Sequence, residues 1–249
     1  MQPLSFREYL DFIEPDETTD IHEKFNQYLR FGGLPTVVEL LDTPDLIGSF
    51  LEGIYNTVLI KDVIERNAVR DAALLESILK YIASNIGSIV SSKKISDYLT
   101  SNGRKTTSDT IDNYLKMLEN AFIIYKANRY DLKGKMFLKT LEKYYMVDMG
   151  LRNQLTGLGN TDLGHVLENL VYLELIRQGY AVSIGKLGSL EVDFVAIKTN
   201  QRVYYQVSAT ILDEKTRERE LRPLQIITDN YPKYIITMDQ PVFQDYAGI

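Results

Sequence analysis

Polar residues interrupt two neighbouring apolar segments near the C-terminus, and this pattern constrains the fold more than any other feature of the chain. The segments are Glu191-Val192-Asp193-Phe194-Val195-Ala196-Ile197 and Tyr204-Tyr205-Gln206-Val207-Ser208. Short apolar runs of this kind are typical of buried strands. Glu191 and Asp193 are two residues apart, so both should point to one face of their strand. Acids and an amide therefore enter an otherwise apolar core.

The elements predicted around these strands follow one order: helix, three strands, helix, strand. Gly179 ends the first helix, Asp213 begins the second, and the apolar pattern predicts a last strand at 234–238. This αβββαβ succession is the core order of the PD-(D/E)xK nucleases, which have the restriction-endonuclease fold. The other predicted ranges are a helix over 162–178, strands over 181–185, 190–197 and 202–209, and a helix from 214 to about 224.

In such a core, carboxylates hold Mg²⁺ or Mn²⁺ through hard oxygen atoms. Glu168 on the first helix, Asp193 and Glu191 are the candidate metal ligands. Gln206 and Ser208 stand where a Glu and a Lys would complete the site, but they offer a neutral carbonyl and no positive charge. Glu168, Asp193, Gln206 and Ser208 therefore make a degenerate nuclease motif, in which metal affinity and general-base chemistry should both be weakened.

Structural explanations of the same residues remain open. Glu168 and Asp193 could hydrogen-bond to the main chain, or pair with Arg177 or Lys186. His165 precedes Glu168 by three residues and could form a ligand pair with it, although a lone helical histidine is more often an ordinary surface or interface residue. The run 217–220, Arg-Glu-Arg-Glu, is predicted to be a solvated helix face with local charge pairing.

The middle third of the chain is its only basic part. Residues 71–150 hold 12 Lys and Arg against 9 Asp and Glu, whereas the whole chain has a formal net charge of −6. Three predicted helices and a hairpin with a basic turn at 131–135 indicate a winged helix, which places its third helix in DNA. That helix carries three acids, Asp109, Asp112 and Glu119, and one base, Lys116. This acidic bias disfavours close approach to DNA phosphates, so the alternative is that the winged helix packs between neighbouring domains without contacting DNA. The candidate phosphate contacts are Lys93, Lys94, Arg104, Lys105, Lys133 and Lys135.

The first seventy residues are acidic and predicted to be helical. One apolar stripe covers 20–31 and ends at Gly32-Gly33, and a second covers 45–66. The abrupt start at residues 3–6 suggests a cut within a larger protein. The chain has no cysteine, which excludes disulfides and thiol catalysis and fits a reducing cytoplasm. It has no apolar run of the roughly 18 residues that a membrane span needs, and no phosphate-cradling P-loop pattern.

Several motifs together resemble the bacterial AAA-superfamily ATPases that carry a C-terminal domain of unknown function. That resemblance implies a P-loop ATPase core, a helical lid, a winged helix and a restriction-endonuclease-like domain. Residues 1–70 would then be the end of the core and the lid, 71–150 the winged helix, and 151–249 the nuclease-like domain. The motifs are Pro3–Leu10, Tyr28–Pro35, Lys61–Val63, Val147–Arg152, Leu167–Asn169 and Glu191–Phe194.

The resemblance also implies partners and cofactors. ATP and Mg²⁺ would belong to a missing N-terminal ATPase core, and the chain would be a non-catalytic module that this motor drives. Its partner would be DNA or an unidentified protein, with no role for a membrane. A Mg²⁺- or Mn²⁺-dependent nuclease and a purely structural or oligomerisation module are the alternatives.

Overall fold

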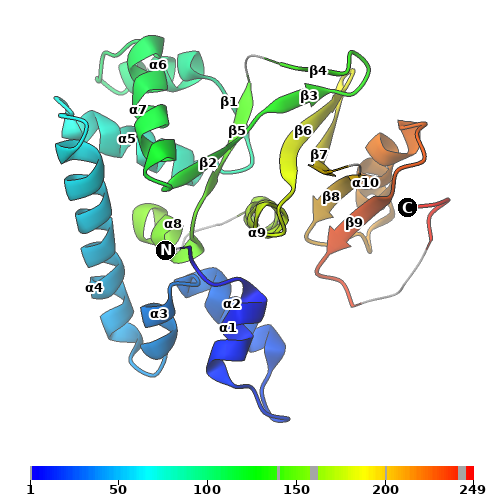
Figure 1. Cartoon of the computed structure of the whole chain (residues 1–249), viewed down its shortest axis with the longest axis horizontal. Coiled ribbons are helices and arrows are strands. Elements are labelled where there is room, and N and C mark those ends of the chain that lie inside the picture. The colour runs from blue at the N-terminus through cyan, green and yellow to red at the C-terminus, as the bar shows by residue number, and fades with distance from the viewer. Residues whose placement is uncertain (1, 139–140, 158–161, 200, 241–244) are drawn as a thin grey trace. The chain divides into compact units, whose positions relative to one another are not determined.

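The computed structural model describes residues 2–138, 141–157, 162–199, 201–240 and 245–249, with the backbone alone at 59–62. The chain mixes helices and strands and belongs to the α+β class, as expected (Figure 1). None of the helices in these ranges is long and apolar enough to cross a membrane.

Contacts divide the chain into two compact units. The first comprises Met1–Ile86, Ser92–Tyr125 and Tyr145–Thr161, and the second comprises Gly87–Ser91, Lys126–Tyr144 and Asp162–Ile249. Residues 71–150 contribute to both units, because the chain passes from one to the other within this range. The predicted division into 1–70, 71–150 and 151–249 therefore differs from the division by contacts, and as a division into domains it stays a prediction.

The first unit is mainly helical. Ser5 begins its first helix with a capping box, in which the serine side chain accepts the N–H of Glu8 and the glutamate accepts the N–H of Ser5. Asp20 caps the second helix in a similar way. The stripe predicted at 45–66 becomes an α-helix followed by a π-helical stretch. The helices are α1 (Phe6–Ile13), α2 (Ile21–Phe31), α3 (Pro35–Glu39), α4 (Pro44–Tyr55), η1 (Asn56–Glu65), α5 (Ala72–Ser84), α6 (Ser92–Ser101), α7 (Ser108–Asn120) and α8 (Met149–Thr156).

A buried carboxylate joins the end of α2 to the start of α8. Asp148 accepts the N–H of Gly33 at 2.8 Å and the N–H of Leu151 at 3.0 Å. Two glycines allow this close approach. Gly32 has φ +84°, and a Cβ on it would lie 2.2 Å from Oδ1 of Asp148; a Cβ on Gly150 would lie 2.0 Å from the carbonyl oxygen of Phe31. Burial raises the pKa of Asp148, while the N–H donors oppose that shift.

Two sheets contain the strands. A three-stranded sheet has the order β1-β5-β2, and a six-stranded sheet in the second unit has the order β4-β3-β6-β7-β8-β9. The basic turn at 131–135 connects β3 to β4 at one edge of the larger sheet. The strands are β1 (Ile89–Val90), β2 (Ile124–Ala127), β3 (Arg129–Asp131), β4 (Met136–Phe137), β5 (Glu142–Met146), β6 (Ala181–Leu187), β7 (Leu190–Lys198), β8 (Gln201–Ser208) and β9 (Lys233–Thr237).

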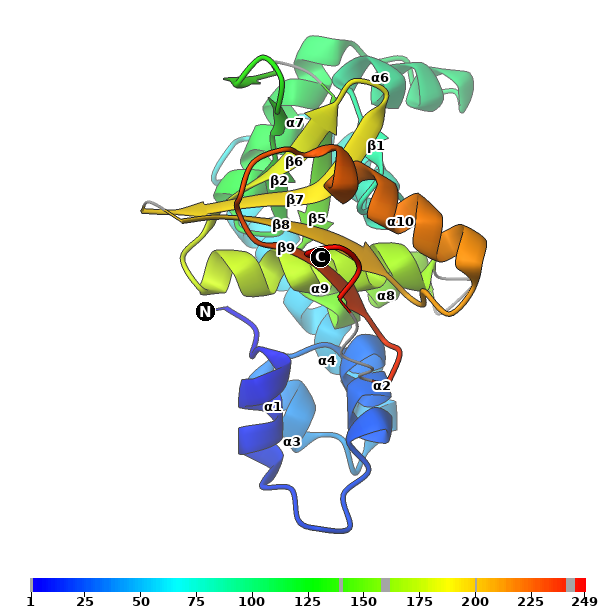
Figure 2. The ribbon, with the colours of Figure 1, turned by 90° about the vertical axis from the view of Figure 1, so that its right-hand side faces the viewer.

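Helices α9 (Leu163–Arg177) and α10 (Glu214–Ile226) flank the six-stranded sheet (Figure 2). The ring of Phe194 on β7 lies 6.0 Å from that of Tyr172 on α9. Its neighbour Val195 packs instead with Tyr204 and with Leu224 of α10. Adjacent residues of a strand point to opposite faces, so the two helices cover opposite faces. This burial on both sides explains why β7 and β8 are nearly continuous apolar runs.

Substituting alanine for Gly32 should destabilise the first unit, whereas the same substitution at a glycine in α4 should not. Gly32→Ala puts a Cβ against the Asp148 carboxylate in a left-handed backbone, so we expect the free energy of unfolding to fall by at least about 2 kcal/mol. The control is Gly48→Ala, because Gly48 lies in α4 with no atom within 4 Å of an added Cβ. That change should stabilise by about 0.5–1 kcal/mol. Urea unfolding measures both, and equal effects would contradict the role of Gly32.

Candidate functional site

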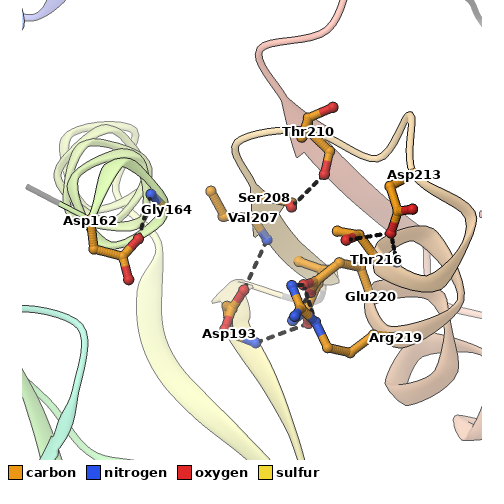
Figure 3. Close-up of polar contacts among 11 residues, drawn as sticks. Asp162, Gly164, Asp193, Val207, Ser208, Thr210, Asp213, Thr216, Arg219 and Glu220 are labelled. Atoms are coloured by element: carbon orange, nitrogen blue, oxygen red, sulfur yellow. Dashed lines mark hydrogen bonds and ion pairs between the residues drawn. The ribbon is translucent and has the colours of Figure 1, made fainter.

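The pairing of β7 with β8 changes where the two strands bring their polar residues together. Main-chain pairing is described as far as Phe194 opposite Tyr205. At the next position the Asp193 N–H donates to Oε1 of Gln206 at 3.4 Å, and the Val207 N–H donates to Oδ2 of Asp193 at 2.9 Å (Figure 3). Side-chain acceptors therefore take the place of main-chain carbonyls, and the strands part around a polar opening.

A β-bulge in β7 also falls at Asp193. Between Ser183 and Gly185 of β6, the partners on β7 run from Val195 to Val192, so β7 contains one extra residue. Bulges bend a strand and redirect its side chains. Val192 and Val195 consequently both pack in the core beneath α10. The bulge leaves Asp193, which lies between them, free to point towards the polar opening.

A buried lysine lies at the centre of the candidate acids. Nζ of Lys143, on β5, is 2.8 Å from Oε1 of Glu168, 2.8 Å from Oε1 of Glu191 and 3.8 Å from Oδ1 of Asp193. Only 4% of the lysine is exposed. The three residues predicted as metal ligands are therefore brought together, and Glu191 and Asp193 share a face as expected. The cation that lies between them is the ammonium group of Lys143.

Charge and burial determine the protonation of this cluster. Burial by itself would lower the pKa of Lys143, but the carboxyl groups of Glu168, Asp193 and Glu191 outweigh it and raise that pKa. For Asp193, burial raises the pKa to about 8, and the charge of Glu168 adds to the rise; Lys143 and the Val207 N–H act against it. The ammonium therefore stays charged at neutral pH, while Asp193 keeps its proton.

Gln206 connects this cluster to α10. Its Nε2 donates to Oε2 of Glu220 at 2.8 Å, and the other oxygen of Glu220 accepts from Nε and Nη2 of Arg219 at 3.0 and 2.7 Å (Figure 3). Glu220 is buried and Arg219 is exposed at 70% of its side chain. The prediction that 217–220 is a solvated helix face is therefore wrong for Glu220. Because its amide is held on both sides, the carbonyl of Gln206 already has a donor.

A cavity of about 620 Å³ lies over these groups. It is lined by the start of α9, the ends of β7 and β8 and one side of α10. Ser208 is on its wall, but the hydroxyl donates to the carbonyl of Thr210 at 2.9 Å (Figure 3). Ser208 therefore takes part in a turn at the end of β8 and supplies no charge to the site.

His165 and Glu168 both line this cavity. Nδ1 of His165 lies 3.3 Å from Oδ2 of Asp162, the residue that caps α9. Gly87, with φ +68°, lets the chain before β1 pass close by: a Cβ there would lie 2.9 Å from His165 and 3.0 Å from Oε2 of Glu168. Among the described residues, no three His, Asp or Glu side chains are grouped so that they could hold a metal ion.

The six candidate DNA contacts are not among the residues that line this cavity. Lys93 and Lys94 are on α6 and Arg104 and Lys105 follow it, all in the first unit, whereas Lys133 and Lys135 are in the β3–β4 turn of the second. All six are exposed. Acidic neighbours partly offset the charge of Lys93 and Arg104: Nζ of Lys93 is 2.9 Å from Asp97, and Nη1 of Arg104 is 3.7 Å from Asp71.

Sequence reasoning did not identify Lys143 or Glu220 as site residues. Glu142 and Lys143 precede the apolar run 144–147 and look like the solvated end of a strand, so no local signal marks the lysine. For Glu220 a signal existed, because Leu224 follows it by four residues and shares its helix face. From the sequence, Arg177 and Lys186 are possible partners of the acids. The structure gives Lys143 as a partner of Glu168 and Glu191, and Arg177 pairs with Glu174 at 3.1 Å.

Removing the lysine should be far more costly than removing a comparable lysine nearby. Lys143→Met leaves the buried carboxyl group of Glu168 and the half-buried one of Glu191 without their cation, so we expect the free energy of unfolding at pH 8 to fall by about 3–5 kcal/mol. The control is Lys126→Met, since Lys126 pairs with Glu142 at 3.4 Å but is 32% exposed, and should cost less than about 1 kcal/mol. Similar losses in the two variants would contradict the cluster.

Asp193 should make stability depend on pH. Its folded-state pKa is raised to about 8 from 3.8, so the bound proton stabilises the folded state at low pH. That contribution is lost as pH rises between these values. The free energy of unfolding of the wild type, relative to Asp193→Asn, should therefore fall from pH 5 to pH 8 by on the order of 1 kcal/mol per pH unit. A difference that stays constant, or that grows with pH, would show that Asp193 is ionised in the folded protein.

The chain is similar to a family of domains of unknown function and to two uncharacterized proteins. A family described as "Domain of unknown function (DUF8612)" matches residues 22–162. An uncharacterized protein of Haemophilus influenzae is 42% identical over 236 residues, which cover 94% of this chain and 58% of the relative. An uncharacterized protein of Methanocaldococcus jannaschii is 26% identical over 257 residues, covering 97% and 57%.

The chain spans less than three fifths of the length of these relatives. No solved structure matches it significantly. The family match extends from α2 to the residue that caps α9, and so includes Lys143 but not the acids that surround it. On this match over more than half of its length, the chain belongs to the DUF8612 family of domains of unknown function.

Proposed function

We propose that the chain is a non-catalytic interaction module, in which a nuclease-like core holds its own cation in place of a metal. The main support for this proposal is the position of Lys143, whose ammonium lies 2.8 Å from both Glu168 and Glu191. A divalent ion would have to occupy the same space between the same oxygens. With the ammonium present, a cation already lies between the two carboxylates, and a divalent ion would have to displace it.

Element order and strand geometry support the nuclease-like part of this proposal. The order α9-β6-β7-β8-α10-β9 is that of the PD-(D/E)xK core, and β7 and β8 part at Asp193 and Gln206, the positions of its metal-binding residues. The order α5-β1-α6-α7-β2, with β5 between β1 and β2 in the small sheet, supports a winged helix. We propose that the module contacts DNA or a protein partner through surfaces outside the cavity.

The resemblance to AAA-superfamily ATPases is the basis for proposing a motor. In that proposal an ATPase core, with ATP and Mg²⁺, drives this module, and residues 1–70 form the lid. The relatives are longer than this chain, which leaves room for such a core in them. Both relatives are uncharacterized proteins.

One observation favours a second candidate, a Mg²⁺- or Mn²⁺-dependent nuclease. A complete nuclease motif would have a lysine at position 208, where this chain has serine. Lys143 could take the role of that lysine, because its Nζ lies 3.8 Å from Oδ1 of Asp193. In that candidate Lys143 would move aside as the metal enters, and its charge would stabilise the attacking hydroxide and the phosphate. Glu168, Glu191 and Asp193 would hold the ion.

Metal binding and DNA cleavage separate the two candidates. For the wild type we expect no heat of Mn²⁺ binding at millimolar metal and no cleavage of plasmid DNA with Mg²⁺ or Mn²⁺, because the ammonium already fills the cluster. Lys143→Ala should gain Mn²⁺ binding in the same calorimetric titration, since it frees the carboxylates. Lys126→Ala is the control and should not gain it. Metal-dependent cleavage by the wild type that disappears in Asp193→Ala would refute the non-catalytic proposal and establish the nuclease.

A further inference from the structure

In the second unit, a row of aromatic and cationic side chains connects the β3–β4 hairpin to the start of β8 and the loop before β9. The ring of Phe137 meets the ring of Tyr130 at 5.2 Å, edge to face. The guanidinium of Arg202 lies 5.9 Å from the centre of the Tyr130 ring and 5.3 Å from that of Tyr231. We name these four residues the aromatic–cation ladder. Segments far apart in the sequence thus meet here: the β3–β4 hairpin, the start of β8 and the loop before β9.

The two ends of the ladder are open to solvent. Phe137 is 62% exposed and Tyr231 43%, and Met136, next to Phe137, is 58% exposed. Large apolar side chains gathered on a surface in this way are typical of a binding site. Contacts along the ladder hold its rings in place before any ligand arrives, so little side-chain freedom would be lost on binding.

The charge around the ladder is opposite to that of the whole chain. Segments 129–137 and 229–233, together with Arg202, carry five Lys or Arg and two Asp, whereas the chain has a formal net charge of −6. Both acids are engaged locally: Asp131 accepts the N–H of Lys133, and Asp229 accepts the hydroxyl of Tyr204 at 2.5 Å. Lys133 and Lys135 are exposed beside Phe137. The surface therefore suits an anionic ligand.

We infer that the aromatic–cation ladder binds single-stranded nucleic acid. Exposed rings flanked by cations are the combination that such strands require, because bases stack on the rings while phosphates pair with Lys and Arg. A duplex keeps the faces of its bases stacked on one another, so it could use the cations but not the rings. An acidic peptide likewise could not stack as bases do. The inference rests on the proposed interaction module and names the class of its ligand.

Fluorescence anisotropy with labelled oligothymidylate tests the ladder directly. The whole chain should bind this strand more tightly than a duplex of the same length. Phe137→Ala combined with Tyr231→Ala should weaken binding of the strand roughly tenfold or more, with little change for the duplex. Lys133→Gln with Lys135→Gln should weaken binding of both and reduce the slope of log affinity against log salt by about 1.4 for the single strand. Phe12→Ala is the control, since Phe12 is 46% exposed on α1.

Three outcomes would overturn the inference. Equal affinity of the wild type and the Phe137/Tyr231 variant would show that the rings do not bind bases. Preference for the duplex would assign the lysines to double-stranded DNA and leave the proposed module intact. Competition by polyglutamate as effective as by unlabelled oligothymidylate would show an anion-binding surface without stacking. None of these results bears on Lys143, which the Mn²⁺ titration and the cleavage assay test separately.

Discussion

The ion pairs of one buried lysine hold the candidate site together. Removing an ammonium from water costs several kcal/mol, and Lys143 recovers that cost only because Glu168 and Glu191 meet it at 2.8 Å. Glu168 comes from α9, Glu191 and Asp193 from β7, and the lysine from β5. Four side chains from three elements are thus mutually dependent, since the buried carboxyl group of Glu168 would lose its cation if the lysine were removed. The bulge in β7 and the parting of β7 from β8 are the local backbone changes that make this geometry accessible.

The same interaction underlies the proposal that this cluster does not bind a divalent ion. A divalent ion needs several anionic oxygens, and here a single positive charge already occupies the space between them. Gln206 adds no charge, and Glu220 and the Asp193 N–H hold its amide on both sides. The anionic cavity is also a poor place for a phosphate in the absence of metal. Contact with nucleic acid therefore fits the basic, aromatic end of the sheet better than the cavity.

Two of the motifs that resemble AAA-superfamily ATPases, Tyr28–Pro35 and Val147–Arg152, have a structural explanation in the first unit. Gly32-Gly33 ends α2 where Asp148 approaches, and Gly150 lies against the carbonyl of Phe31. Asn153 then donates to the carbonyls of Leu29 and Arg30 at 3.0 and 2.9 Å, which satisfies the end of α2. These residues make a close helix-to-helix junction that a side chain larger than hydrogen would break. Their role is to build the fold, whereas Glu168 and Asp193 contribute to the candidate site.

Local pattern was sufficient for much of this protein. Apolar periodicity, caps and glycine stops place α2, α9 and the strands from β6 to β8 within a few residues, because these signals act over one or two turns of chain. Spacing also put Glu191 and Asp193 on one face. The sequence could not show that Lys143 would lie among these acids, because the lysine is 25 residues from Glu168 and 50 from Asp193, and only the packing of β5 brings them together. It also could not show that the basic turn would become the edge of the larger sheet, or that Tyr130, Arg202 and Tyr231 would meet. Such contacts depend on which strands pair, and pairing between distant segments is decided by the tertiary fold.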